Sequence, residues 1–133
     1  MSDELYKAYL AGLIDGEGSV LLEHAHSNEY RSPAVSISTT SLELFDGLVE
    51  KYGGTISKKH EREGCKAAYQ YKVKTNKALK MLEDILPYLK HQQKIARAKH
   101  LVNKYKAVTQ RNGKYNEEQL KNKIKFEEEF FEL

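Results

Sequence analysis

The chain has 133 residues, 40% of them hydrophobic, which suits one domain with a single modest core. Its longest apolar run, Leu10–Ile14, is far shorter than the roughly 20 residues of a membrane span, and no cationic, hydrophobic signal segment follows Met1. The net charge of +3 is unremarkable, and a single cysteine, Cys65, excludes an intrachain disulfide and a thiolate metal cage. We therefore expect an unsecreted protein of the cytoplasm or an organelle matrix, without a membrane partner.

The first predicted element is a helix over Glu4–Gly16. Its apolar and small residues recur at spacings of three and four, on neighbouring turns, as an amphipathic helix requires. Gly16 and Gly18 bracket Glu17, and glycine at these positions can end the helix or let two backbones approach closely.

Alternating side chains predict four strands, while a helix over Ser41–Tyr52 separates the second strand from the third. The helix is expected to have Ser41 as N-cap, to present Leu44, Phe45, Leu48 and Val49 as an apolar stripe and to end at Gly53. The predicted strands are Ser19–His26, Ala34–Thr39, Thr55–His60 and Ala68–Lys74.

Helices fill the rest of the chain. One is predicted over Asn76–Leu86, and another follows Pro87 and runs to about Lys106. A charged, helical tail begins at Asn116 and ends in phenylalanines, which brace the core, extend a dimer or stay loosely attached. We interpret the chain as a single domain with a core of about residues 5–105 and a helical extension over residues 115–133.

Two strand pairs with short connections predict an α+β fold, in which a four-stranded antiparallel sheet carries its helices on one face. The other face is expected to be polar and either meets a wet or charged partner or simply faces water. Because the major groove of DNA admits antiparallel β-ribbons, we assign this face and the charged loop beside it to DNA contacts. The assigned residues are Ser19, Leu21, Glu23, Ser36, Ser38, Thr55, Ser57, Lys59, Arg62, Gln70 and Lys72.

Charge is distributed unevenly along the chain. Residues 1–50 hold 2 basic and 9 acidic side chains, residues 51–114 hold 17 and 4, and residues 115–133 hold 3 and 6. The middle segment thus carries a net charge of +13, interleaved with tyrosines. Such a segment is typical of a protein with a polyanion partner, and the alternative is a set of solvated lysine-rich faces.

Residues 10–18 read LAGLIDGEG and resemble the motif that names the LAGLIDADG family of homing endonucleases, matching it at seven of nine positions. Gly16 stands where the family has alanine, and Glu17 replaces the last aspartate but keeps a carboxylate. The resemblance covers roughly residues 5–105.

The resemblance implies an αββαββα fold with a saddle-shaped sheet, to which this chain adds C-terminal helices. It also implies that the motif helices of two units pack side by side. Only one motif is visible here, so a symmetric homodimer on a near-palindromic double-stranded DNA site is expected. The implied interface residues are Tyr9, Gly12, Leu13, Asp15 and Gly16.

The resemblance further implies metal-dependent hydrolysis of DNA, with Glu17 as the catalytic acid and the Gly16 carbonyl as a second metal ligand. Carboxylate oxygens suit Mg²⁺, for which Mn²⁺ or Ca²⁺ can substitute in binding, and no organic cofactor is expected. Asp15 is assigned to helix capping or the interface, not to catalysis.

Two further catalytic positions are implied by the family pattern. A basic residue near the start of the later helix is matched by Gln92, with Lys90 as the residue that reaches in instead; if neither Lys90 nor Lys94 does so, slow or absent cleavage is expected. A polar residue at the end of the second strand is matched by Thr39 or Ser38.

Three function classes follow, of which the third is a purely structural dimer. The first is a site-specific, metal-dependent DNA endonuclease encoded by a mobile element such as an intron. The second is a cleavage-inactive nucleic-acid-binding protein, either an intron RNA maturase or a DNA-binding regulator. Glu17 favours the endonuclease, because an acid aimed at phosphate weakens simple DNA binding.

Overall fold

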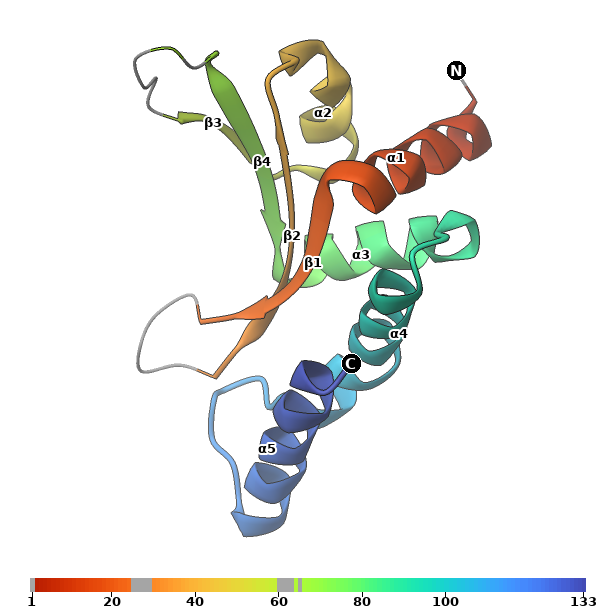
Figure 1. Ribbon diagram of the computed structural model, residues 1–133. Coiled ribbons are helices and arrows are strands. Elements are labelled where there is room, and N and C mark those ends of the chain that lie inside the picture. The colour runs from red at the N-terminus through yellow and green to blue at the C-terminus, as the bar shows by residue number, and fades with distance from the viewer. Residues whose placement is uncertain (1, 25–29, 60–63, 65) are drawn as a thin grey trace.

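The structure is a computed structural model and describes residues 2–24, 30–59, 64 and 66–133. Its elements follow the predicted order, so the αββαββα arrangement with additional C-terminal helices is confirmed (Figure 1). Ala25, His26 and His60, which the sequence placed at strand ends, lie outside the described residues. In chain order the elements are α1 Asp3–Glu17, β1 Gly18–Glu23, β2 Ser32–Thr39, the 3₁₀ turn η1 Leu42–Phe45, α2 Leu48–Tyr52, β3 Thr55–Lys59, β4 Ala68–Lys74, α3 Thr75–Ile85, the 3₁₀ turn η2 Leu86–Tyr88, α4 Gln92–Val108 and α5 Glu117–Phe131.

The four strands form one antiparallel sheet in the order β1-β2-β4-β3. Successive side chains in a strand point to opposite faces, so the pairing register assigns each residue to a face. The apolar row across the sheet places Val20 opposite Val35 and Val35 opposite Val73, and all three are buried. The alternation predicted from the sequence is therefore confirmed for these strands.

Helices α1, α3 and α4 cover the apolar face of the sheet and leave the opposite face open (Figure 1). Leu10 and Ile14 of α1 are fully buried in this layer, as are Leu82 of α3 and Leu101 of α4. Each of these side chains contributes about 1.5–3 kcal/mol through burial. This packing fixes the orientation of α1 over the sheet and hence the position of its C-terminal end.

The segment after β2 differs from the single helix predicted over residues 41–52. It forms η1 and the short helix α2, which are separated at Gly47, a residue in the left-handed region at φ 83°. The hydroxyls of Tyr6 and Tyr9 on α1 donate to the carbonyls of Asp46 and Leu44 at 3.0 and 2.7 Å. These carbonyls therefore accept hydrogen bonds from α1 and not from the next turn of a continuous helix. Burial raises the pKa of Tyr6 to about 12, which keeps this donor protonated.

Two residues of that predicted helix have other roles. Ser41 occupies the N-cap position of η1 but its side chain makes no capping hydrogen bond there, and its backbone N–H donates to Thr39 Oγ1 at 3.0 Å. Val49, expected in the apolar stripe, is 40% exposed because α2 is a short helix at the margin of the sheet. The break at Gly47 therefore turns part of the predicted stripe toward solvent.

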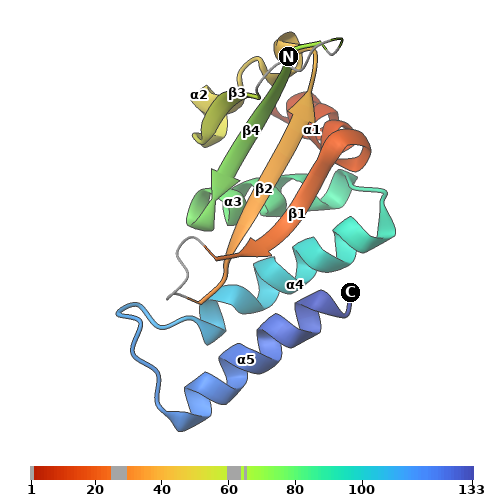
Figure 2. The same cartoon turned by 60° about the vertical axis from the view of Figure 1, so that its left-hand side comes forward.

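The C-terminal helix α5 lies alongside α4 (Figure 2). Asn116 caps it through a reciprocal capping box with Gln119. Phe126 and Phe130 are buried, and the Phe126 ring stacks on His100 of α4 with centroids 4.6 Å apart. These two phenylalanines thus brace the core, whereas Phe131 is 52% exposed.

Among the described residues, no helix combines the length and apolar composition needed to span a membrane.

Candidate active site and nucleic-acid interface

The end of α1 passes directly into β1 between Glu17 and Gly18. A Cβ atom on Gly18 would lie 2.8 Å from Ile14 Cα, so only glycine permits this close approach of strand and helix. The Glu17 side chain is exposed at this junction. The tight turn therefore presents a carboxylate where the helix layer meets the sheet.

The start of α4 holds this end of α1 in place. The Asp15 carboxylate accepts from the backbone N–H groups of Lys90 and His91 at 2.9 and 3.0 Å. Lys94 Nζ donates to the carbonyls of Ile14 and Asp15, both at 2.8 Å. A cation on the last carbonyls of a helix adds to their hydrogen bonds and complements the helix dipole. Lys94 thereby fixes the turn that carries Glu17.

An exposed stripe of short side chains and one leucine runs along α1, comprising Leu5, Ala8, Gly12 and Gly16. Leu5 is 63% exposed. A Cβ atom added to Gly12 or Gly16 would meet nothing within 4 Å, so both glycines border open space. We call these four residues the α1 stripe; it allows another helix backbone to approach closely.

Two residues that the sequence assigned to a dimer interface contact the chain itself. Leu13 is buried in the core cluster of the chain itself, so it does not belong to the exposed surface of α1. Tyr9 is partly buried against the core and hydrogen-bonded to Leu44. Of the other assigned residues, Asp15 caps the start of α4, and only Gly12 and Gly16 belong to the α1 stripe.

The open face of the sheet carries the polar residues assigned to it, arranged in transverse rows. One row runs through Ser19, Ser36, Lys72 and Thr55, and a second runs through Ser38, Gln70 and Ser57. We call this surface the polar face; it also includes Leu21, Glu23 and Lys59. Arg62, also assigned to DNA, lies outside the described residues.

Cations and acceptors already interact on the polar face. Lys72 forms an ion pair with Glu23, in which Nζ lies 2.5 Å from Oε1. Lys59 Nζ donates to Ser38 Oγ at 3.1 Å. These contacts hold long side chains above the sheet, where hydroxyl, amide and ammonium groups can reach base edges or phosphates.

A divalent cation fits the end of α1 by the chemistry of its donors. Glu17 offers an exposed carboxylate, and the Gly16 carbonyl is among the last of the helix, which lack intrahelical partners. Both are hard oxygen ligands of the kind Mg²⁺ prefers. Within the described part of the chain no three His, Cys, Asp or Glu residues cluster as a metal site.

The sequence model of the family described as LAGLIDADG endonuclease matches residues 10–119 of the chain. The chain belongs to this family. The match runs from Leu10 within the motif helix through the whole sheet and α4 to the start of α5. No curated protein sequence matches the chain significantly.

Solved LAGLIDADG homing endonucleases have the same fold at low sequence identity. The archaeal intron-encoded I-Vdi141I, solved in complex with DNA, is 19% identical over 98% of this chain and 85% of that chain, with a TM-score of 0.62. I-TnaI is 16% identical over 92% and 86%, also with a TM-score of 0.62. I-CvuI, solved with its target in the presence of Ca, is 22% identical over 76% of this chain, with a TM-score of 0.59. The chain spans 66% of the length of the I-CvuI chain.

The other catalytic residues implied by the LAGLIDADG pattern lie in different places. Thr39 pairs with Tyr69 on the helix-covered side, and its hydroxyl accepts from Ser41, so Thr39 does not belong to the polar face. The alternative, Ser38, does lie on that face. Gln92 begins α4 with an exposed side chain, and Lys90 is exposed and bonds Asp15 through its backbone only. Lys94 is the lysine that reaches the motif.

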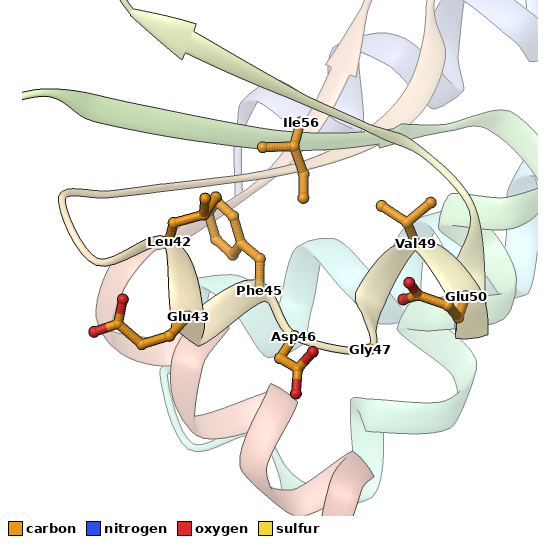
Figure 3. Close-up of a pocket in the computed structure, with 8 residues that line it drawn as sticks. All are labelled: Leu42, Glu43, Phe45, Asp46, Gly47, Val49, Glu50 and Ile56. Atoms are coloured by element: carbon orange, nitrogen blue, oxygen red, sulfur yellow. The ribbon is translucent and has the colours of Figure 1, made fainter.

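A cavity of about 610 Å³ lies elsewhere and does not belong to this LAGLIDADG site (Figure 3). Ile56 of β3 faces the segment that carries Phe45, and Leu42 and Val49 complete the apolar wall. Glu43, Asp46 and Glu50 also line the cavity. Three carboxylates beside an apolar hollow disfavour a nucleic-acid backbone, so the polar face remains the candidate DNA surface.

Sequence reasoning missed two members of the α1 stripe, Leu5 and Ala8. The spacing of 5, 8, 12 and 16 was available as a signal, because residues three and four apart share a helix face. Which face of α1 the core would bury depends on packing against the sheet.

Proposed function

We propose that this chain acts as a homodimeric DNA endonuclease that uses a divalent cation to hydrolyse both strands of a long, near-palindromic target. The observation that carries this proposal is the exposed Glu17, held at the end of the α1 stripe and beside the polar face. A single acid in each copy cannot serve two strands, whereas a two-fold pair of copies supplies two acids.

The α1 stripe supports the arrangement of the dimer. Gly12 and Gly16 expose backbone one helical turn apart and have open space above them. Packing of this stripe against the same stripe of a second copy would bring the two Glu17 side chains toward one seam. The polar faces of both copies would then extend outward along one duplex, each facing a half-site.

Within each copy, different residues bind DNA, position the catalytic acid and hold the metal ion. The polar face contacts phosphates for affinity and base edges for specificity. Lys94 holds the carbonyl end of α1 and so keeps Glu17 in position. Glu17 and the Gly16 carbonyl would hold Mg²⁺, which when bound stabilises charge on the phosphate and favours ionisation of an attacking water.

The relatives are consistent with this proposal. I-Vdi141I is described in complex with DNA, and I-CvuI with its target in the presence of Ca. A further I-CvuI structure is described with a target in the presence of Mg and with the DNA not cleaved. These descriptions motivate testing binding and cleavage of DNA separately.

The decisive experiment is cleavage selection on a randomised duplex library, with and without Mg²⁺, followed by kinetics of Glu17→Gln on the selected site. Loss of the carboxylate removes several kcal/mol of transition-state stabilisation, so cutting should fall by about a thousandfold or more while binding persists. Glu50→Gln, which changes an exposed glutamate on α2, is the matched control and should cut normally.

Each result of that experiment has a distinct meaning. If Glu17→Gln cuts at the normal rate, the catalytic assignment is wrong. If the unaltered protein binds DNA or intron RNA but cuts no member of the library with Mg²⁺, the chain is instead a cleavage-inactive binder.

A further inference from the structure

A second cavity is lined by residues that precede β2 and by residues of α4, the α4–α5 loop and α5. The α4–α5 loop lies toward the end of β1 that is farther from α1 (Figure 2). The volume of the cavity is about 480 Å³, within the range of small-ligand sites. The described residues that line it include three cations, Arg31, Arg111 and Lys123, and no carboxylate. The remaining lining consists of hydroxyl and amide side chains and one glycine. We call it the α4–α5 pocket.

Lys123 forms a buried cationic wall of this pocket. Lysine side chains are rarely buried, but this one is only 1% exposed. Its Nζ donates to Thr109 Oγ1 at 2.7 Å and lies 4.5 Å from the Tyr105 ring centroid and 5.5 Å from that of Phe126. An ammonium has three N–H donors. One hydroxyl acceptor and two aromatic rings only weakly offset the free-energy cost of removing the charge from water. The site therefore favours an anionic ligand.

The acid nearest to Lys123 does not neutralise the pocket. Glu127 raises the pKa of Lys123, but burial outweighs this and lowers the pKa overall. Glu127 also pairs with Arg31, whose Nε lies 3.7 Å from Oε1. One carboxylate is thus shared by two cations, and Arg111 adds a third positive charge on the exposed turn above them.

Neutral donors supplement these cations. Tyr115 accepts a hydrogen bond from the backbone N–H of Gln110 at 3.3 Å, which leaves its own hydroxyl proton to donate. The Tyr30 ring packs edge-on against Tyr115, with centroids 5.0 Å apart, and fixes the phenol at the pocket wall. Cations and hydroxyl donors, with no carboxylate among the lining residues, suit a tetrahedral oxyanion such as phosphate.

The position of the pocket indicates the source of that phosphate. Arg31 Nη1 donates to the carbonyl of Leu22 at 3.4 Å, and Arg31 directly precedes Ser32. Ser32 pairs with Glu23 as the last described pair of β1 and β2 at the outer end of the polar face. A backbone phosphate of a duplex that extends past this end could therefore reach Arg111, whose side chain is exposed, while Lys123 adds its positive charge from behind the pocket surface.

We propose that the α4–α5 pocket binds a phosphate group, which in the nucleic-acid complex is a backbone phosphate beyond the outer end of the polar face. The nucleic-acid source rests on the proposed function, whereas binding of phosphate itself does not. A pocket that binds phosphate from solution alone has the same chemistry but a different source. The two sources differ in whether the pocket changes the salt dependence of DNA binding.

The test uses the full chain and two variants, Lys123→Met and Arg111→Gln. Methionine keeps most of the lysine stem, and Arg111 is exposed, so the second variant serves even if the first fails to fold. Lys125→Met changes an exposed lysine on the same helix and is the matched control. Thermal unfolding checks that each variant is folded.

In the first arm, inorganic phosphate is titrated into each protein and followed by calorimetry. We expect binding to the unaltered chain and to the control, and at least about tenfold weaker binding to both variants, equivalent to about 1.4 kcal/mol. In the second arm, affinity for a mixed-sequence duplex is measured against salt in EDTA, where cutting cannot interfere. Loss of one phosphate contact should lower the slope of log K against log salt by about 1.

The outcomes separate the sources. A lower slope, with or without detectable binding of free phosphate, supports the backbone source. Weaker phosphate binding with an unchanged slope supports a pocket for free phosphate. Unchanged behaviour in both arms overturns the proposal. Because neither arm requires cutting, failure of the Glu17 assignment leaves this test intact.

Discussion

Glu17 and Lys123 are charged residues on helices of this chain, and the structure treats them in opposite ways. Glu17 is exposed, and only the neighbouring turn is held tightly, by Asp15 and Lys94. Lys123 is 1% exposed and surrounded by aromatic rings and a hydroxyl within its own chain. In the proposed dimer, a second copy and DNA would complete the Glu17 site, whereas the residues around Lys123 all belong to one copy.

This difference predicts how each site responds to substitution. Changes around Glu17 should alter assembly and cutting with little effect on the folding of one copy. Changes at Lys123 should alter the stability of one copy directly, because removal of a buried charge changes the free energy of unfolding. The predictions below test that contrast.

The largest effect is expected from Gly12→Leu in the α1 stripe. Within one copy the new side chain enters open space, and removing glycine from a helix should stabilise the copy by about 0.5–1 kcal/mol. In a dimer two leucines would enter a close helix contact at about 1–3 kcal/mol each, so the dimer should weaken roughly a hundredfold or more. Analytical ultracentrifugation, thermal unfolding and cleavage assays measure these effects.

Lys99→Leu is the control for Gly12→Leu, because it adds leucine at an exposed position of α4. It should leave both assembly and cutting unchanged. An unaltered dimer in Gly12→Leu would remove α1 from the interface and with it the pairing of two Glu17 residues.

A smaller effect is expected from Lys94→Met. The substitution removes two charge-assisted hydrogen bonds from the end of α1 and loosens the turn that carries Glu17. We expect kcat to fall by roughly tenfold to a hundredfold, with little change in KM, because misplacement of a catalytic group affects mainly the chemical step. Single-turnover and steady-state kinetics distinguish the two parameters.

Lys90→Met is the matched control, since its exposed side chain has no hydrogen bond to the motif in the described structure. It should cut at nearly the normal rate. A larger loss in Lys90→Met than in Lys94→Met would transfer the positioning role to Lys90.

Much of the fold was predictable because local patterns and packing agree. The bounds of β4 match the predicted strand Ala68–Lys74, in which Tyr71 and Val73 are buried and alternate with Lys72. The turn at Gly18 was also predictable, since glycine at a helix end indicates a close approach of backbones. Here sequence-local interactions and the tertiary fold favour the same conformation.

The errors arise where distant parts of the chain decide the outcome. The break at Gly47 depends on hydroxyls from Tyr6 and Tyr9, which are far away in the sequence. Thr39 was assigned to the site with Ser38 as the alternative, and a shift of one residue in a strand reverses the face. Leu13 was assigned to an interface, although packing of α1 on the sheet buries it.

The α4–α5 pocket had no signature in the sequence because its residues come from the segment just before β2, the end of α4, the following loop and α5. Lys123 lies in a run of charged residues that indicates an exposed face. Lys123 lies three residues before Phe126 on α5 and therefore on the same face of the helix. Phe126 is buried against His100 of α4, so this face of α5, including Lys123, packs inward. Such placement requires knowledge of the helix pairing.

The smallest expected effect is the change in pH-dependent stability of Lys123→Met. Burial lowers the pKa of Lys123, so between that lowered pKa and the ordinary value of 10.5 the unfolded chain binds more protons than the folded chain. The stability of the unaltered protein therefore includes the full cost of this buried charge below the lowered pKa, and the cost diminishes as pH rises toward 10.5. Urea unfolding should show Lys123→Met to be more stable by about 1 kcal/mol at pH 7, with a smaller advantage at pH 10. Lys125→Met should show no such pH-dependent difference, and a Lys123→Met protein less stable at pH 7 would mean that the Thr109 hydrogen bond and ring contacts outweigh the cost of burying the ammonium.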